Sequence, residues 1–420
     1  MARGARGHDD AERNGLAGRS ALPIPIAPAL SLAGLALVAA VSIGLLGGSL
    51  PSLPGGDGGN GNGDGGPART PTPSNVVVTD PRADVLGSIL YVKAGNVWVQ
   101  TGDEARQLTD GGQDSMPTWS PDGQFVYLIR TASQEGRWPS GGIVRRYQLE
   151  VPRLVRIRAD GTGEPEVLLV GRIRRSGNVW SYFLRQPAVS PDGSTVALVT
   201  DGPNPTVSDI VVKLLDLEAG ELSDPELPQS GGLGHQDPTW SPDGRLLAYV
   251  RVVREGTRGT PIIRRYNLET GRSSNITAPG YLAPSWSPDG QYLAATRTSN
   301  FGTDVVILDA RNGAELLRVT SDERSFNPVW SPKGDAIAFL KVQHGVVDLW
   351  VVSLEGAGPG WTLGEPVPMT LLAGLEAKSR PTWFIPADQL PRPTPTPLAT
   401  PTPLATPASQ APAASPTPGS

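Results

Sequence analysis

The sequence contains no cysteine and little of the other residue types that usually carry chemistry. Without cysteine, disulfides, thiolate metal sites, a cysteine nucleophile and a lipid-modified N-terminal cysteine are all excluded. Histidine occurs three times in 420 residues, at His8, His235 and His344, so a three-histidine zinc site would need His8 of the N-terminal tail. Charged residues make up 18% of the chain and the net charge is −5, which argues against a nucleic-acid-binding protein.

Glycine and proline, by contrast, are abundant, with 51 and 43 residues that together exceed a fifth of the sequence. Both residues interrupt regular helices, so this proportion excludes a helical bundle. A chain of this length can form two or three ordinary domains or one large all-β domain. The composition therefore favours a β-rich architecture with many turns.

The N-terminal region contains the one long apolar run. Residues 1–21 are polar and are expected to form a cytoplasmic tail, and residues 22–50 are expected to form a transmembrane signal anchor. Its uncharged part, Ala29 to Leu50, has 22 residues, and as a helix it would span about 33 Å against a bilayer core of about 30 Å. Arginines precede the run, which predicts a cytoplasmic N-terminus and an extracytoplasmic remainder at the cell membrane. A cleaved signal peptide, giving a secreted protein, and a buried soluble helix are the alternatives.

Two low-complexity segments flank the central region. Residues 51–84 are rich in glycine and proline and are expected to form a linker, flexible at first and stiffer towards its end. Residues 387–420 are rich in proline and threonine and have almost no apolar bulk to bury, so an extended, disordered tail is expected. A spacer role and an inert tail are equally compatible with this composition.

Residues 85–386 contain an internal repeat. Its copies resemble P-x-W-S-P-D-G, with spacings of 70, 51, 46, 44 and 53 residues, and they start at Met116, Gln186, Asp237, Ala283, Asn327 and, in truncated form, Arg380. P-T-W-S is typical of a short strand, S-P-D-G of a tight turn, and the following segment, such as LLAYV at 246–250, of a second strand. With two further strands in each unit, the pattern predicts one four-stranded propeller blade per repeat.

The two ends of this region predict a closed ring. The truncated copy at residues 380–386 is followed by no strands of its own, whereas residues 88–109 supply the second to fourth strands of a blade that lacks its first. The C-terminal strand would complete that blade, which gives an all-β fold of six four-stranded antiparallel blades. A linear solenoid is the alternative, but it would leave two strand edges open.

The repeat resembles the TolB-like six-bladed β-propeller family, and it is also similar to the propeller of prolyl-oligopeptidase-like peptidases. The resemblance covers residues 85–386 and departs from TolB in lacking a small α/β domain ahead of the propeller. Val189 replaces the tryptophan of one copy, and Lys333 replaces the turn aspartate of another. The resemblance implies contact surfaces at one rim of the ring and at its central funnel, in a bacterial-type cell envelope.

Three insertions predict a binding surface on one face of the ring. Loops between the second and third strands of a blade share a face with the loops that link blades, and we call this the top face. The insertions 131–150, 171–186 and 252–267 map to it and interleave arginines with aromatic residues, which favours an anionic or glycan ligand or an acidic partner surface. Solvated hairpin extensions are the alternative. The candidates, which include two histidines expected on the same face, are Arg137, Trp138, Arg145, Arg146, Arg172, Arg174, Arg175, Trp180, Tyr182, Arg185, His235, Arg254, Arg258 and His344.

The recurring tryptophans and aspartates are expected to be structural, and no catalytic residue, metal ligand or cofactor is predicted. His235 and His344, with Asp114 and Asp237 near the same rim, leave a metal or acid–base site as a weaker hypothesis. No G-x-S-x-G motif and no hydrolase domain accompany the repeat. We therefore expect a non-catalytic, membrane-anchored extracytoplasmic platform that binds an envelope protein or a cell-wall or anionic ligand, and no nucleic acid. The alternatives are a glycan sensor and a metal-dependent hydrolase or lactonase with its site in the funnel.

Overall fold

The computed structural model describes residues 80–390 except positions 141, 204–209, 226, 229–233 and 256–257, and only the backbone of 253–255 and 258. The predicted cytoplasmic tail, the transmembrane segment, nearly all of the linker and the C-terminal tail from residue 391 lie outside the described residues. Within the described part, no helix is long and apolar enough to cross a membrane. Its helices are the 3-10 turns η2 (Pro81–Asp84) and η3 (Ala387–Gln389).

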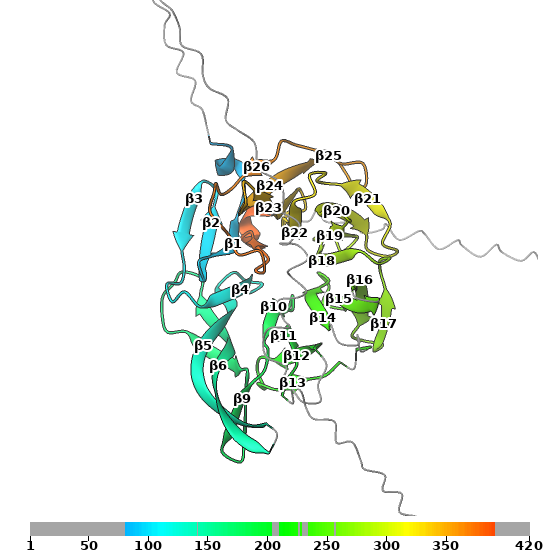
Figure 1. Ribbon diagram of the computed structural model, residues 1–420. Coiled ribbons are helices and arrows are strands. Elements are labelled where there is room, and N and C mark those ends of the chain that lie inside the picture. Colours follow the sequence, from blue (N-terminus) through cyan, green and yellow to red (C-terminus); the bar gives the residue numbers. More distant parts are fainter. Residues whose placement is uncertain are drawn as a thin grey trace, which may run out of the picture.

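The described residues form six antiparallel sheets arranged radially around a central axis (Figure 1), so the predicted six-bladed propeller is confirmed. The first blade contains β27 (Thr382–Phe384), β1 (Ser88–Lys93), β2 (Asn96–Thr101) and β3 (Glu104–Gln107). The second contains β4 (Asp114–Trp119), β5 (Phe125–Ser140), β6 (Ile143–Arg158) and β7 (Glu166–Val170), with β8 (Arg172–Arg175) and β9 (Asn178–Ser181) added to the same sheet. The third contains β10 (Arg185–Val189), β11 (Thr195–Thr200), β12 (Val211–Asp216) and β13 (Leu222–Ser223).

The remaining three blades follow in chain order. The fourth contains β14 (His235–Trp240), β15 (Leu246–Glu255), β16 (Arg258–Asn267) and β17 (Arg272–Asn275). The fifth contains β18 (Tyr281–Trp286), β19 (Tyr292–Thr298), β20 (Thr303–Asp309) and β21 (Glu315–Arg318). The sixth contains β22 (Ser325–Trp330), β23 (Ala336–Gln343) and β24 (Val346–Glu355), and its outer strand is split into β25 (Thr362–Leu363) and β26 (Val367–Pro368), both of which pair with β24.

The S-P-D-G segments form the tight turns that the sequence predicted, and the serine side chain holds each turn together with the aspartate. In the first turn, the Ser120 hydroxyl donates to Asp122 Oδ1 at 2.5 Å and accepts from the Phe125 N–H, while the same Oδ1 accepts from the Gln124 N–H. The glycine that ends the turn, Gly123, has φ +70°, which only glycine adopts without strain. Each turn therefore closes the hairpin between the first and second strands of its blade.

The threonine that recurs after the fourth strand also has a structural role. Thr109 Oγ1 accepts a hydrogen bond from the Val97 N–H at 3.0 Å, and Thr277 Oγ1 accepts from the Ile263 N–H at 3.1 Å. A buried backbone N–H of the third strand therefore finds a partner where the fourth strand has already ended.

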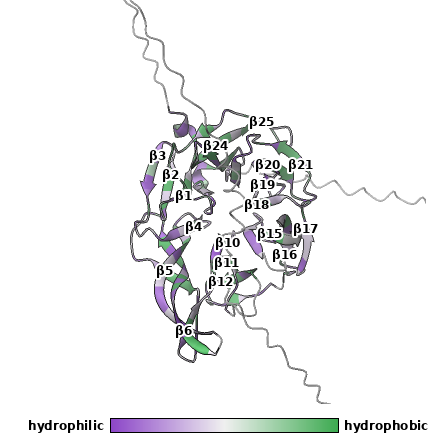
Figure 2. Cartoon of the chain, in the orientation of Figure 1, coloured by the Kyte–Doolittle hydropathy of each residue, from purple (hydrophilic) through white to green (hydrophobic). Residues whose placement is uncertain are grey.

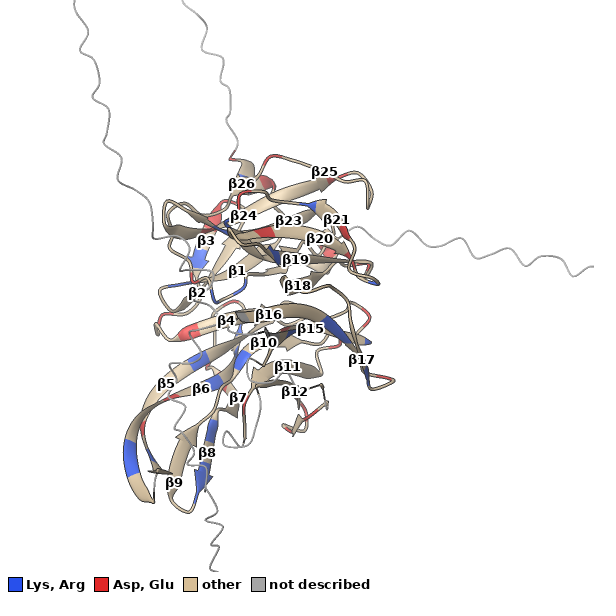
Figure 3. Ribbon diagram, turned by 45° about the vertical axis from the view of Figure 1, so that its right-hand side comes forward, with Lys and Arg blue, Asp and Glu red and all other residues tan. Residues whose placement is uncertain are grey.

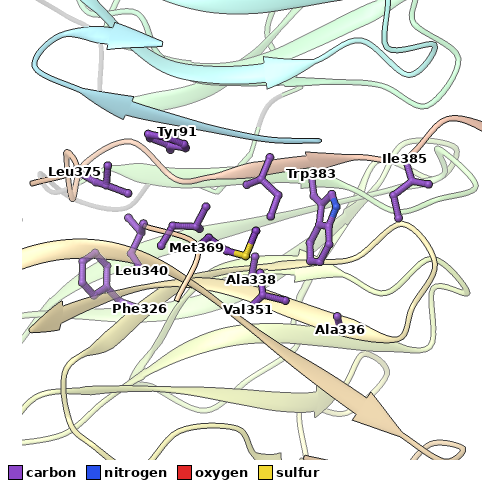
Figure 4. Close-up of a cluster of buried hydrophobic side chains, with 12 residues drawn as sticks. Tyr91, Phe326, Ala336, Ala338, Leu340, Val351, Met369, Leu375, Trp383 and Ile385 are labelled. Atoms are coloured by element: carbon purple, nitrogen blue, oxygen red, sulfur yellow. The ribbon is translucent and has the colours of Figure 1, made fainter. Parts of the chain in front are cut away.

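The hydrophobic core is divided among the interfaces between neighbouring blades. Figure 4 shows the cluster at ring closure, where Trp383 and Ile385 of the C-terminal segment pack with Tyr91 of the first blade and with Phe326 and Met369 of the last. The final strand β27 pairs with β1 in the register Ile89↔Trp383, and the indole Nε1 of Trp383 donates to the Leu86 carbonyl at 2.9 Å. The C-terminal strand therefore completes the first blade as expected.

Candidate functional site

A long β-extension projects from the second blade (Figures 1 and 3). The outer halves of β5 and β6 run past the ring as a hairpin, residues 131–152, and the β8–β9 hairpin lies beside it, paired to β5 through Arg137↔Val179. We call residues 131–152 and 172–181 the wing. Two of the three insertions that sequence analysis placed on the top face, 131–150 and 171–186, are thus joined in one sheet, which that analysis did not predict.

The wing has an aromatic face. Residues directly opposite in an antiparallel ladder share a face, and the pairs Trp138↔Arg145 and Gly136↔Tyr147 place their side chains together. Trp180 of β9 lies against this face, with ring centroids 6.0 Å from Trp138 and 5.1 Å, edge-on, from Tyr147. These rings are half-buried, so the aromatic residues hold the two hairpins of the wing together.

A glycine makes this contact between the hairpins possible. A Cβ atom on Gly136 would lie 2.1 Å from the Leu149 Cδ1 and 2.9 Å from the Val179 carbonyl oxygen. Both distances are shorter than a real Cβ contact allows, so a larger residue would push β9 away from β5. The Gly in the segment QEGRW therefore marks a close approach of backbone rather than a turn.

The opposite face of the wing carries arginines. Arg146, Arg137 and Arg174 lie in one row across β6, β5 and β8, with Val179 of β9 between the last two. Arg146 forms an ion pair with Glu135 at 3.3 Å, and the two side chains are 78% and 61% exposed. Arg137 donates to the Gly177 carbonyl at 3.1 Å. In Figure 3 the basic positions of β5, β6 and β8 are blue.

Other arginines of the wing differ in their freedom to contact a partner. Arg145, Arg174 and Arg175 are exposed and make no hydrogen bond or ion pair with any described residue. Arg172 is half-buried and donates to the Gln134 Oε1 at 3.1 Å, so it links β8 to β5. Eight candidates from the sequence are thereby brought together on the wing: Arg137, Trp138, Arg145, Arg146, Arg172, Arg174, Arg175 and Trp180.

Exposed apolar side chains also gather on the top face. Ile143 and Val144, at the tip of the wing, are 63% and 54% exposed (Figure 2). Phe301, in the loop between β19 and β20, and Leu371 and Leu372, in the link from β26 to β27, are exposed on the same face of the ring. Sequence analysis named none of these, although an I-V pair directly after a glycine pair at a hairpin tip is a readable signal.

The central channel is lined by a recurring bulge in the inner strands. The residue before the motif proline has φ between 50° and 53° in five blades, and the strand register shifts at the same point. Proline lacks an N–H and so fits a bulge, where the ladder hydrogen bond is missing. The five residues are Met116, Gln186, Asp237, Ala283 and Asn327.

These bulge residues connect neighbouring blades around the channel. Asp237 Oδ1 accepts from the Gln186 Nε2 at 2.5 Å, and its Oδ2 accepts from the Ala283 N–H at 3.1 Å. On the closing side of the ring, Asn327 Nδ2 donates to the Ala377 carbonyl and the Met116 N–H donates to the Ser379 Oγ. The polar groups of these bulge residues, which were expected to line the funnel, are therefore largely hydrogen-bonded to other parts of the chain.

Buried charges lie at the same level of the channel. Burial raises the pKa of Asp237, and the nearby charges of Arg380 and Arg185 oppose that rise. Burial in turn lowers the pKa of Arg380, which donates to the Pro284 carbonyl at 2.7 Å, and the pKa of Arg185, whose guanidinium lies over the Phe183 ring. The charged form of each of these groups carries a desolvation cost that the opposite charges offset in part.

The remaining candidates are dispersed. Tyr182 is buried below the wing and its hydroxyl donates to the Val170 carbonyl, and Arg185 belongs to the inner strand β10. His235 is fully buried in the fourth blade, where its Nε2 lies 2.9 Å from the Pro228 carbonyl and its ring contacts Tyr249, so its predicted role as a surface contact is not supported by this geometry. His344 is exposed in the β23–β24 turn of the sixth blade.

Arg254 and Arg258 lie at the ends of β15 and β16, and their side chains are outside the described part. Asp114, which the metal hypothesis used, is bound through both oxygens by Arg130, at 2.7 and 2.8 Å. Among the described residues, no group of three or more histidines, aspartates or glutamates is placed to hold a metal ion.

Comparisons with known proteins place the ring among propellers. The family model described as the TolB beta propeller domain matches residues 168–358. The solved structure of TolB from Acinetobacter baumannii aligns with a TM-score of 0.51 and 18% identity, over 71% of this chain and 66% of that chain. At that identity the structural likeness shows the fold alone. The resemblance to TolB-like propellers, first seen in the P-x-W-S-P-D-G repeat, is confirmed.

Two further relatives are more partial. An uncharacterized protein of Agrobacterium fabrum is 29% identical over 158 residues, which cover 36% of this chain and 45% of that protein. The chain thus spans less than half of the length of this curated relative. A prolyl endopeptidase structure aligns with a TM-score of 0.40 and 18% identity, over 60% of this chain and 36% of that chain.

Proposed function

We propose that this chain, whose ring is a six-bladed propeller of the TolB type, is a non-catalytic, membrane-anchored extracytoplasmic platform that binds a partner in the cell envelope. The observation that carries the proposal is the wing, which extends from the ring with a row of arginines on one face. Arginines are costly to gather in one place unless an anionic group faces them, and exposed arginine and aromatic side chains are enriched in contact surfaces. The partner surface is therefore assigned to the wing and the adjoining top face.

The direction of the chain supports this assignment. The first described residues lead into the start of β1, and the last follow the end of β27, which lies opposite that start through the pair Ser88↔Phe384. Both ends therefore leave the ring on the face opposite to the wing. A tether on that side would hold the top face and the exposed Phe301, Leu371 and Leu372 towards a partner.

The anchoring is proposed from the sequence of residues 1–50. Deleting this segment should move the protein from the membrane fraction to the soluble fraction, since about 20 apolar residues are needed to span a bilayer. Alkaline washing of membranes and protease treatment of intact cells would test anchoring and the extracytoplasmic position. A full-length chain in the soluble cytoplasm would contradict the proposal, and a shortened, secreted chain would replace the anchor by a cleaved signal peptide.

A capture experiment tests the platform. The full chain in detergent serves as bait for the solubilised envelope of the same organism, beside a variant with Arg137→Ala, Arg146→Ala and Arg174→Ala, the three arginines of the row. A matched control carries Arg272→Ala, an exposed arginine on β17 of the fourth blade. A component retained by the chain and the control but lost from the triple variant supports the wing as the site. Equal retention by all three baits would move the site off the arginine face, and no retained component would contradict a platform.

Cell-wall glycans are the second candidate, because the Trp138–Trp180–Tyr147 cluster offers aromatic surface beside arginines. Soluble wall fragments that raise the melting temperature of the wild-type chain, but not of a Trp138→Ala variant, would favour this ligand over a protein. An unchanged melting temperature would contradict it.

A further inference from the structure

The outer half of β6 has an open edge. Residues 143–150 pair with β5 along their whole length, but no described strand lies on their other side, because β7 pairs with β6 only at residues 153–156. The outer strands of five blades, β3, β13, β17, β21 and β25, are two to four residues long. Short outer strands are a common way to prevent pairing with other chains, so this long edge is an exception among the strands that the structure describes.

The register identifies the backbone groups that this edge presents. Ser140 pairs with Ile143, which leaves two residues in the hairpin loop, and such a loop is closed by a hydrogen bond between its flanking residues. In an antiparallel ladder, hydrogen-bonded and non-hydrogen-bonded pairs alternate. The N–H and C=O groups of Val144, Arg146 and Gln148 therefore point away from β5, towards the open edge.

The side chains along this edge have a definite pattern. Arg146 lies directly opposite Arg137, and like charges in such a pair destabilise the ladder. The row continues to Arg174, and within the described structure Arg146 of this row pairs with the exposed Glu135. On the other face, Tyr147 and Ile143 flank the edge, and Ile143 is largely exposed. The first face thus carries more positive than negative charge, with three arginines against Glu135 and Glu150, and the other has apolar surface to cover.

We propose that the β6 edge at residues 143–150 takes an extended acidic segment of a partner protein as an additional strand. Its backbone would pair with Val144, Arg146 and Gln148. Alternate side chains of that segment would place carboxylates beside Arg146, on the face that Arg137 shares, and apolar groups beside Tyr147. This inference rests on the proposed platform function and specifies its partner. A second copy of this chain does not fit, because two such edges side by side would set arginines against arginines.

The test uses the full chain and a defined probe. A short fluorescent peptide that alternates glutamate with valine is titrated with the protein, beside a peptide that alternates lysine with valine. The key variant is Gln148→Pro, which removes an outward N–H and obstructs an incoming strand. Gln148→Ala is its matched control, because it keeps the N–H and loses only the side-chain bond to the Ser133 hydroxyl.

We expect the glutamate peptide to bind the chain and the Gln148→Ala variant alike, and the Gln148→Pro variant about tenfold more weakly or worse. The fluorescence of Trp138 and Trp180 in each variant verifies that the wing is folded. The lysine peptide should not bind the wild-type chain. No binding of the glutamate peptide at millimolar concentration, or equal binding by the proline variant, would overturn strand addition.

A charge exchange separates strand addition from general attraction. Arg146→Glu should weaken the glutamate peptide and create binding of the lysine peptide, whereas Arg272→Glu on the fourth blade should change neither. Vesicles of anionic phospholipid that bind wild type and Gln148→Pro equally, while the glutamate peptide does not bind, would assign the surface to lipid and overturn the proposal. If the envelope capture succeeds and is indifferent to Gln148→Pro, the platform function holds and strand addition fails.

Discussion

Gly136 is a single position on which the assembly of the wing depends. Replacing it by alanine puts a Cβ within 2.1 Å of the Leu149 side chain and 2.9 Å of the Val179 carbonyl oxygen. The side chain can move but the carbonyl belongs to β9, so we expect the β8–β9 hairpin to separate from β5, at a cost of about 1–3 kcal/mol. Hydrogen exchange at Val179 and Trp180 should become faster.

Gly111→Ala is the matched control, because a Cβ there meets no atom within 4 Å and the backbone does not require positive φ. It should leave both the exchange rates and the unfolding free energy nearly unchanged. Equal exchange rates at Val179 in the two variants would contradict the close-approach role of Gly136.

The turn aspartates are a second effect at the scale of single residues. The pKa values of Asp122, Asp192 and Asp243 are lowered, chiefly by the hydrogen bond from the preceding serine hydroxyl. Below the ordinary carboxyl pKa of 3.8 the unfolded chain therefore binds more protons than the folded chain, and stability falls as the pH falls. Asp192→Asn should reduce this acid-side slope in urea unfolding, whereas Asp103→Asn, an exposed residue with no side-chain bond among the described residues, should not.

Sequence analysis predicted these turns from S-P-D-G but left the copy with Lys333 as an exception. The structure shows that Asp335, two residues further on, replaces the missing aspartate and accepts from the Ser331 hydroxyl at 3.0 Å. A motif read position by position does not find this exchange, because the hydroxyl needs a carboxylate within reach rather than at one fixed position. The chemistry of the turn is kept while its spacing changes.

At the scale of the strand, the inner-strand bulges carry information that the sequence shows only in part. The proline of each P-x-W motif marks the bulge. The type of the residue before it differs between blades, for example Met116 and Asn327, because its contacts are made with a neighbouring blade or link. The pairing of β9 with β5 was likewise beyond the sequence, since segments about 40 residues apart meet there through a single register pair. That the insertions 131–150 and 171–186 lie on the top face, by contrast, followed from counting the strands of each blade.

The buried groups Asp237 and Arg380 give a prediction at the scale of the strand. Asp237→Asn places an amide where one of two accepting oxygens stood and removes the charge near Arg380, so we expect a loss of about 1–3 kcal/mol in unfolding free energy. Arg380→Met should also destabilise, but the double variant should lose less than the sum, because each single variant leaves the other charge buried without compensation. Strictly additive losses in urea unfolding would show that the two groups are not coupled.

At the scale of the whole molecule, the sequence predicted the number of blades and their closure, because both depend on repeats that can be counted. The truncated copy at Arg380 and the incomplete first blade complement each other, and β27 pairs with β1 as that arithmetic requires. From the sequence, the proposed binding surface could be assigned only to the top face as a whole. A repeat pattern shows neither the sheet of the wing nor the exposed side chains of Leu371 and Leu372.

Ring closure leads to a final prediction. Trp383 joins β27 to the first and last blades through the pair with Ile89, the bond to the Leu86 carbonyl and the cluster around Met369. Trp383→Ala should lower the unfolding free energy by about 3–5 kcal/mol, as expected for a buried tryptophan. It should also remove hydrogen-exchange protection from Leu90, because this residue of β1 faces Thr382 of β27 and loses its neighbour. Trp98→Ala, in the half-buried middle of β2, should cost less and leave β1 protected, since the ring stays closed. Protection of Leu90 retained in the Trp383 variant would contradict this role of the tryptophan, because it would show that β27 stays paired with β1 without the indole.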